Sequence, residues 1–228
     1  MAESIVGPEH KLYTYWRSSA SWRVRIALAI KGVDYEYIPV HLLGAVQKTS
    51  DYQALNPMAQ VPTLVTPSGA VLTQSLAIME YLEESFPGKS LLPGDPTQRA
   101  HIRAMAEIVN SGIQPLQNLG VLQYIEKETS ETKKVEWARH WIEKGLSALE
   151  HYAAGHSTAG RYCIGDEVSI ADCCLIPQLY ASRRFGADLD KYPKLLAIES
   201  HLQTLPEFIA AHADAQPDKD APIPAKST

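Results

Sequence analysis

Cysteine is scarce in this sequence: there are three in 228 residues, and none occurs before Cys163. Three cysteines, two of them adjacent, are too few for a disulfide scaffold, which favours a reducing cytoplasm. The long stretch before Cys163 also cannot carry out dithiol chemistry. The sequence contains no HExxH pair, no Cys/His cluster with zinc-ligand spacing, no GxGxxG and no Walker A loop, so we expect neither a metal nor a nucleotide.

Long apolar runs are absent as well. None approaches the roughly 18–20 residues that a membrane span needs, and the first residues lack the basic and apolar blocks of a secretory signal. The 21 Lys and Arg against 26 Asp and Glu give a net charge of −5, and neither half shows a basic face. We therefore expect a cytoplasmic protein that binds no membrane and no nucleic acid.

What is present in the first 90 or so residues is an alternation of strand and helix patterns. An aromatic strand pattern, an apolar helix ending at Gly32 and a second β-branched strand form a βαβ unit with parallel strands. Two short strands then flank the Pro-Ser-Gly turn at 67–69, which predicts an antiparallel hairpin, and a helix follows. With a short helical segment at 51–55 before the hairpin, this order is the thioredoxin-like plan, with strands predicted at 10–16, 35–40, 61–65 and 71–73 and helices at 22–31 and 76–86.

Beyond this part the pattern changes to long helical periodicity. Residues 89–96 (KSLLPGDP) are rich in Gly and Pro and are typical of a linker. We predict a thioredoxin-like α/β domain over 9–88, an all-α domain over 97–212 whose last helical segment covers 192–212, and a flexible, Pro-rich tail over 213–228.

Small polar residues stand between the first predicted strand and the first predicted helix. The N-H groups at a helix N-terminus favour an anion, and the hydroxyls of Ser18 and Ser19 can donate to it. A thiolate suits such a place, and because the chain supplies no cysteine there, the thiol would come from a ligand. The alternative is that one serine only caps the helix.

Two further features would fall on the same edge of a thioredoxin-like domain. If the Val61–Pro62 bond were cis, it would turn the backbone of Val61 toward a ligand, whereas an ordinary trans proline at a strand start is the alternative. Gln74 and Ser75 precede a helix, and Ser75 is the expected N-cap. The free N-H groups at the start of this helix could hold a carboxylate. The alternative is that Ser75 only caps the helix. The convergence of the three features predicts a binding site.

In the second half, Ser169 and Asp172 form a capping-box pattern that we interpret as structural. Cys173 and Cys174 lie on the same apolar helix and are expected to pack in the core. Arg183 and Arg184 end that helix, either as cations that complement its dipole or as an anion site for a substrate carboxylate.

Several segments of the chain resemble the zeta-class glutathione transferases, the maleylacetoacetate isomerases. The similarity spans roughly residues 10 to 217, and its motifs are RSSASWRVRIAL at 17–28, QALNPMAQVPTL at 53–64, QSLAIMEYL at 74–82, GIQPLQNL at 112–119 and GDEVSIAD at 165–172. The resemblance implies the glutathione transferase fold and a cytoplasmic homodimer that uses glutathione as its cofactor.

The implied activity is the isomerisation of maleylacetoacetate to fumarylacetoacetate in phenylalanine and tyrosine catabolism, through thiolate addition, bond rotation and elimination. One alternative is a zeta-like transferase that conjugates or dehalogenates small haloacids. The other is a non-enzymatic scaffold of the same fold, against which the presence of the complete serine and proline motifs argues.

The resemblance also implies site residues. Ser18 would stabilise the glutathione thiolate, with Ser19 as an auxiliary donor and Arg184 as the partner of a substrate carboxylate. The chain departs from the family at Ala20, where a cysteine is usual, and at Gly120, where a polar residue is usual. The glutathione site would be lined by Ser18, Ser19, Ala20, Ser21, Trp22, Arg23, Gln47, Val61, Pro62, Gln74, Ser75, Gln114, Asn118, Leu119 and Gly120.

Overall fold

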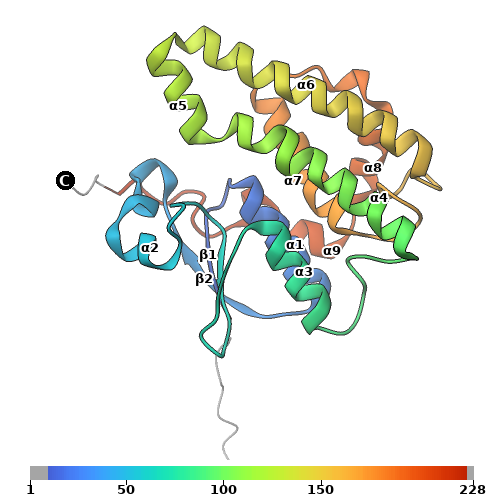
Figure 1. Cartoon of the computed structure of the whole chain (residues 1–228), viewed down its shortest axis with the longest axis horizontal. Coiled ribbons are helices and arrows are strands. Elements are labelled where there is room, and N and C mark those ends of the chain that lie inside the picture. Colours follow the sequence, from blue (N-terminus) through green and yellow to red (C-terminus); the bar gives the residue numbers. More distant parts are fainter. Residues whose placement is uncertain (1–9, 225–228) are drawn as a thin grey trace, which may run out of the picture. The chain divides into compact units, whose positions relative to one another are not determined.

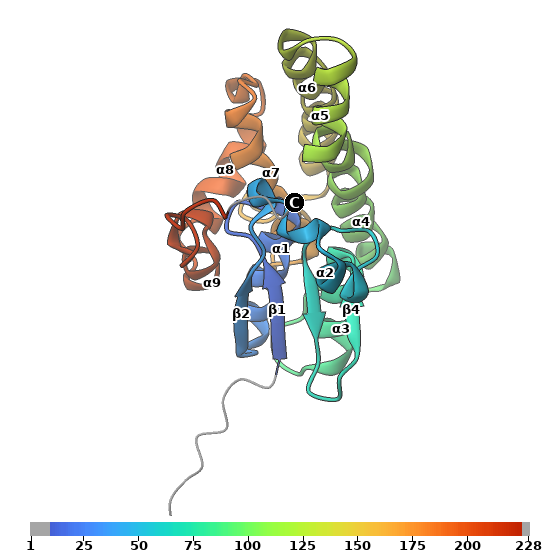
Figure 2. The same ribbon diagram turned by 90° about the vertical axis from the view of Figure 1, so that its left-hand side faces the viewer.

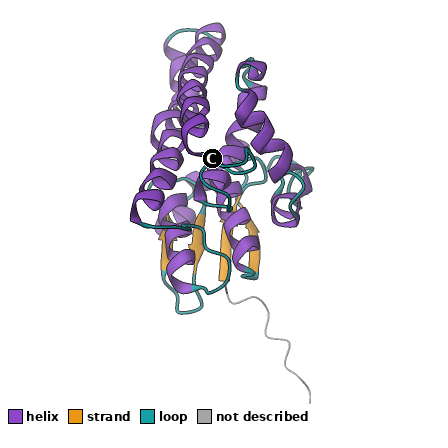
Figure 3. Ribbon diagram, turned by 90° about the vertical axis from the view of Figure 1, so that its right-hand side faces the viewer, coloured by secondary structure: helices purple, strands orange, loops and turns teal. Residues whose placement is uncertain are grey.

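The computed structural model describes residues 10–224, which form two compact units. One unit combines the chain up to Lys89 with the segment from Glu207 onward, and the other covers residues 90–206. The first unit carries all the strands of the described chain, whereas the second is helical (Figure 3). The predicted combination of a thioredoxin-like α/β domain and an all-α domain is confirmed.

The sheet of the first unit has four strands in the order β2-β1-β3-β4. β1 (His10–Thr14) and β2 (Tyr35–Pro39) are parallel, and β3 (Thr63–Val65) pairs antiparallel with both β1 and β4 (Val71–Thr73). The predicted βαβ unit and hairpin are therefore present. β1 ends two residues earlier than predicted, at Thr14, because the next two carbonyl groups accept hydrogen bonds from the Arg25 side chain.

Helices cover both faces of this sheet. α1 (Ser19–Lys31) and α3 (Ser75–Ser85) lie side by side on one face, and α2 (Ser50–Leu55) lies on the other (Figures 1 and 2). α1 ends where Gly32 adopts the left-handed conformation and its N-H bonds back to the helix. The core between the sheet and the α1–α3 layer consists of large apolar side chains, among them Leu12, Ile26, Leu28, Leu64, Ile78 and Met79.

The described part of the predicted flexible tail, residues 213–224, is held in place, and residues 225–228 lie outside the described residues. From Glu207 onward, α9 (Pro206–Ala211) belongs to the first unit, as does a short 3-10 turn, η6 (Ala213–Ala215). After them Gln216 and Asp218 are buried, 8% and 5% exposed. Two polar side chains that are satisfied by hydrogen bonds anchor a segment with few apolar residues, which composition alone does not reveal.

The second unit is a bundle whose longest helix is α6, residues Glu131–His156. The predicted last segment, 192–212, is divided in two, because Pro206 has no N-H to continue a helix and instead begins α9. No helix among residues 10–224 is long and apolar enough to cross a membrane. The other helical elements of this unit are α4 (Pro96–Glu107), η3 (Ile108–Ile113), η4 (Gln114–Gln117), α5 (Leu119–Glu128), α7 (Ile170–Arg184), η5 (Leu189–Lys191) and α8 (Pro193–Leu202).

Candidate active site

Ser18 occupies the N-cap position of α1. Its Oγ accepts a hydrogen bond from the N-H of Ser21 at 3.2 Å, and its own N-H donates to the carbonyl of Tyr15 at 3.0 Å. A hydroxyl oxygen that accepts in this way still has its hydrogen to donate. Ser18 is therefore both the cap that we weighed as the structural alternative and a donor at the positive end of a helix dipole.

The rest of the first turn of α1 divides into two groups. Ser19 and Ala20 are half-buried, whereas Ser21, Trp22 and Arg23 are at most 1% exposed. The Oγ of Ser21 has no hydrogen-bond partner among residues 10–224. Trp22 and Arg23 were expected to line the site. Because they are buried, we expect them to shape it from within the domain.

Arg23 joins the N-terminus of α1 to the N-terminus of α3. Its Nη1 donates to the Oγ of Ser75 at 3.2 Å, and Ser75 is 4% exposed. Ser75 was expected to be the N-cap of α3, but it is the first residue of that helix. The N-cap is Gln74, which has a φ of 69° and makes no side-chain capping hydrogen bond. Two helix N-termini therefore lie next to each other in one domain, an arrangement that suits an anionic ligand.

The loop before β3 presents Val61 and Pro62. The peptide bond between them is cis. The side chains of Tyr52 and Asn56 both donate to the carbonyl of Gln60, at 2.6 and 2.7 Å. No hydrogen bond engages the peptide groups of Val61 in the described part of the chain. The loop is thus fixed on one side while the backbone of Val61 keeps its polar groups for a ligand.

Gln47 belongs to the same unit, on the short turn η2 (Val46–Lys48). Its side chain is buried, and its Nε2 lies 3.4 Å from the carbonyl of Leu42. Its Oε1 has no partner within residues 10–224. A buried amide oxygen without a donor is costly, so a ligand N-H is the natural partner for it.

Four of the candidate glutathione-binding residues lie in the second unit. Gln114 begins η4, and Asn118 caps α5 by accepting from the N-H of Gly120 at 3.1 Å. Leu119 is the first residue of α5. A side chain at Gly120 would meet only the Oδ1 of Asn118 at 3.9 Å, so the polar residue usual in the family would fit there.

Arg184 and its neighbour Arg183 have different surroundings. Arg183 makes a bidentate ion pair with Glu199, at 2.6 and 2.5 Å. The guanidinium of Arg184 lies 5.7 Å from the centre of the Phe185 ring, and the side chain is exposed. The bidentate pair with Glu199 gives Arg183 a structural role, and Arg184 stays the residue that the resemblance assigns to a substrate carboxylate.

The residues interpreted as structural have that role. The capping box of Ser169 and Asp172 is formed, and the N-H of Cys163 also donates to Asp172 at 2.8 Å. Burial raises the pKa of the Cys163 thiol, and Cys173 and Cys174 are fully buried, so none of the three is an activated nucleophile. No group of three metal-binding side chains is found between residues 10 and 224.

Comparison with known proteins shows the family of this chain. The family models for the N-terminal and the C-terminal domain of glutathione S-transferase match residues 8–84 and 116–214. Maleylacetoacetate isomerase of Mus musculus is 50% identical over 214 residues, which is 93% of this chain and 96% of that protein.

Two solved structures have the same fold. A bacterial maleylpyruvate isomerase described as a zeta-class glutathione S-transferase in its holo form gives a TM-score of 0.88 at 42% identity, covering 91% of this chain and 99% of that one. The maleylacetoacetate isomerase of Anaeromyxobacter dehalogenans 2CP-1, with dicarboxyethyl glutathione and citrate bound in its active site, gives 0.83 at 47% identity, with 93% and 97% covered. The chain belongs to the glutathione S-transferase family and, within it, to the zeta class of maleylacetoacetate isomerases.

Proposed function

We propose that this protein catalyses the glutathione-dependent cis–trans isomerisation of maleylacetoacetate to fumarylacetoacetate, a step in phenylalanine and tyrosine catabolism. The observation that carries the proposal is the pairing of two helix N-termini by the Arg23–Ser75 hydrogen bond, with the Ser18 hydroxyl at the first of them. The relatives named for this reaction, about half identical over nearly the whole chain, support it.

The first unit supplies groups for each part of glutathione. The Ser18 hydroxyl donates to the thiolate, with Ser19 as a second donor. Ser75 and the N-H groups at the start of α3, after Gln74, suit the γ-glutamyl carboxylate. The peptide groups of Val61 pair with the cysteinyl backbone beside Pro62, and the Oε1 of Gln47 accepts from a ligand N-H.

The chemistry follows from the thiolate. Its sulfur adds to one carbon of the cis double bond, and the electron pair of the π bond moves toward the conjugated carbonyl group. The former double bond is now single and rotates. Elimination then re-forms the double bond as trans and releases the same thiolate, so no net proton, electron or glutathione is consumed. A preorganised donor at the sulfur favours the departing thiolate, which is the anion formed in the last step.

In the second unit, Arg184 is the proposed partner of a substrate carboxylate, and the resemblance to the zeta class also assigns Gln114 and residues 118–120 to glutathione. Arginine suits this role because its planar guanidinium binds a carboxylate through two parallel hydrogen bonds. Gly120 leaves space where relatives carry a polar side chain, which favours a different substrate preference more than a loss of glutathione binding.

We expect the Arg184→Ala variant to raise the KM for maleylacetone, a smaller analogue of the substrate, about 10- to 100-fold, because a hydrogen bond to a charged group is lost. Its affinity for glutathione should stay unchanged. Arg161→Ala is the matched control, since that guanidinium also lies over a neighbouring aromatic ring, Tyr162, at 6.0 Å. If Arg184→Ala and Arg161→Ala had the same KM for maleylacetone, Arg184 would not be the partner of the substrate carboxylate.

We also propose that the protein acts as a homodimer in the cytoplasm. The dimer rests on the resemblance to the family, and sedimentation should give twice the 25.2 kDa of the chain. The cytoplasm is supported by three cysteines that all remain free thiols in the described structure, as in a compartment where glutathione is reduced.

Parallel assays with maleylacetone and with a small haloacid test the proposed reaction. Isomerisation that requires glutathione supports it and shows that Ala20 is tolerated. Haloacid turnover without isomerisation would support the zeta-like transferase alternative instead. No turnover in either assay, together with failure to bind immobilised glutathione, would support the alternative of a non-enzymatic scaffold.

A further inference from the structure

A buried arginine holds the loop that leads to Ser18. Arg25, on the second turn of α1, is 1% exposed. Its guanidinium donates to the carbonyl groups of Tyr15 at 3.3 Å and Trp16 at 2.9 Å, and to the Oγ1 of Thr14 at 3.1 Å. Its Nε donates to the carbonyl of Ala211 at 3.3 Å. One cation thus joins the end of β1, helix α1 and the end of α9.

The opposite side of the same loop is held by the C-terminal segment. The Oδ2 of Asp218 accepts from the N-H of Trp16 at 3.1 Å, and its Oδ1 accepts from the hydroxyl of Tyr37 at 2.5 Å. The carboxylate is 5% exposed. The peptide groups on the two sides of Trp16 are therefore held by a buried cation and a buried anion, two residues before Ser18. Burial lowers the pKa of Arg25, and groups that include Asp218 oppose that shift.

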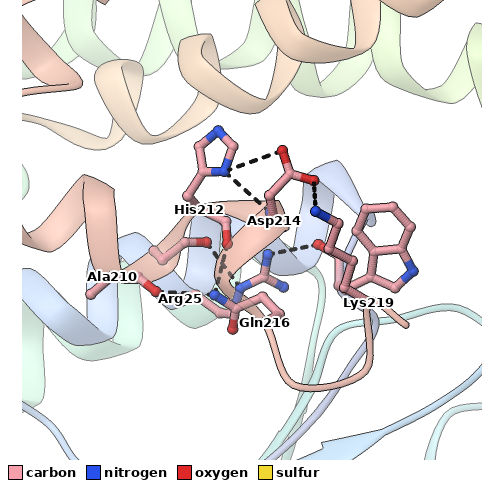
Figure 4. A network of polar contacts seen from close by, with 8 residues as sticks. Arg25, Ala210, His212, Asp214, Gln216 and Lys219 are labelled. Atoms are coloured by element: carbon pink, nitrogen blue, oxygen red, sulfur yellow. Dashed lines mark hydrogen bonds and ion pairs between the residues drawn. The ribbon is translucent and has the colours of Figure 1, made fainter. Parts of the chain in front are cut away.

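Further contacts fix the segment that carries Asp218. The Nε2 of Gln216 donates to the carbonyl groups of Ala210 and His212, at 3.0 and 2.8 Å. Asp214 and Lys219 form an ion pair of 3.1 Å across the same turn. Figure 4 shows these side chains gathered around Arg25. Hydrogen bonds and an ion pair among residues 210–219 therefore stabilise this turn.

The segment then continues to a second loop of the candidate glutathione site. An ideal Cβ on Gly44, in the turn η1 (Leu42–Gly44), would lie 2.9 Å from the Cδ of Pro224. Gly44 is three residues before Gln47. Residues 216–224 therefore reach from the loop of Ser18 to the loop of Gln47, two of the places that we assign to glutathione in the first part of the chain.

From this geometry we infer that Asp218 is a positioning residue for the thiolate site: it fixes Trp16, and through it the Ser18 hydroxyl, in the place that the glutathione sulfur requires. The inference rests on the proposed function of Ser18. A misplacement of about 1 Å in a catalytic group costs up to about 10²-fold in rate. The C-terminal segment would then control the reactivity of bound glutathione more than its affinity.

Asp218→Ala in the full chain tests this inference. We expect kcat for maleylacetone to fall about 10- to 100-fold, and the thiol of bound glutathione to titrate at higher pH when its ultraviolet thiolate absorbance is followed. The dissociation constant of glutathione should change less than kcat does. Asp218→Asn should recover much of the loss, because its amide oxygen can accept from Trp16 while its NH₂ donates to Tyr37.

Two further variants separate positioning from a general structural effect. Asp220→Ala changes an exposed aspartate on the same segment and should behave as the wild type. Tyr37→Phe removes the other hydrogen bond of Asp218 but keeps the bond to Trp16, so it should loosen the segment without moving the thiol titration.

The outcomes are distinct for the inference and for the function on which it rests. A thiol titration in Asp218→Ala that matches the wild type would overturn the inference, even if the variant were less stable. If the wild type bound glutathione without isomerising maleylacetone, the proposed reaction would fall while the titration would still decide the role of Asp218. If the wild type bound no glutathione, both would fall.

Discussion

Replacing Ser18 with alanine is expected to lower kcat for maleylacetone about 10²–10³-fold, the effect of removing one donor to a developing anion. Affinity for glutathione should change far less, because Ser75, Gln47 and the peptide groups of Val61 remain. The hydroxyl also caps α1, so a loss of about 1 kcal/mol in the free energy of unfolding is expected as well. Kinetics, thiolate titration and thermal unfolding of the same preparation measure the three effects.

Two controls accompany this variant. Ser130→Ala removes an N-cap of the same kind from α6, where the side chain accepts from the N-H of Lys133 at 3.2 Å. It should cost similar stability and leave the thiolate titration unchanged. Ser19→Ala tests the neighbouring hydroxyl. Near-normal turnover in Ser18→Ala combined with a large loss in Ser19→Ala would mean that the thiolate donor is Ser19.

The largest effect on stability is expected for Asp172→Ala. The Asp172 carboxylate accepts from the N-H of Cys163 and from the N-H and hydroxyl of Ser169, at 2.8, 2.8 and 2.9 Å. All of these atoms are buried, and each donor left without a partner costs about 1–3 kcal/mol. We expect the free energy of unfolding to fall by about 3–5 kcal/mol, measured by urea denaturation. Asp166→Ala, an exposed aspartate of the same segment, should be close to neutral.

The difference in the free energy of unfolding between the wild type and Asp172→Ala should depend on pH, and the direction of this dependence follows from the pKa of Asp172. Burial raises the pKa of Asp172 to about 6, against the opposing effect of its hydrogen bonds. The folded state therefore binds a proton more tightly than the unfolded state does, and stability from this group increases as the pH falls from 7 toward 4. The wild type should gain about 1 kcal/mol over Asp172→Ala between pH 7 and pH 5. A constant or shrinking difference would contradict this assignment.

Local signals in the sequence predicted most of the fold. The βαβ unit follows from an apolar helix between two β-branched strands, and the hairpin from the turn at residues 67–69, because both depend on neighbours in the chain. The division of 192–212 at Pro206 was missed, although proline is a known helix breaker, because the apolar periodicity continues across it. The packing of the C-terminal segment was missed for a different reason: it depends on Asp218, whose partners Trp16 and Tyr37 are far away in sequence.

The candidate site could be predicted from two sources: the sequence signals of helix N-termini and the resemblance of the chain to the zeta class. Ser18 and Ser75 stand just before or at the start of apolar helical patterns, and such positions carry their own signal. The link between them through Arg23 is a contact over 52 residues and has no local signal. For Arg25 the sequence carries a weak signal, because a cation between Val24 and Ile26 on an apolar helix needs a buried partner. Asp218 offered none, because a polar, Pro-rich segment favours disorder on composition.

The most direct test of the central claim follows maleylacetone and glutathione together through many turnovers of the wild-type protein. The account predicts conversion to the trans product that requires glutathione, with the glutathione concentration unchanged at the end. Conversion that proceeds equally well without glutathione would contradict it, and so would the loss of one glutathione for each molecule of product formed.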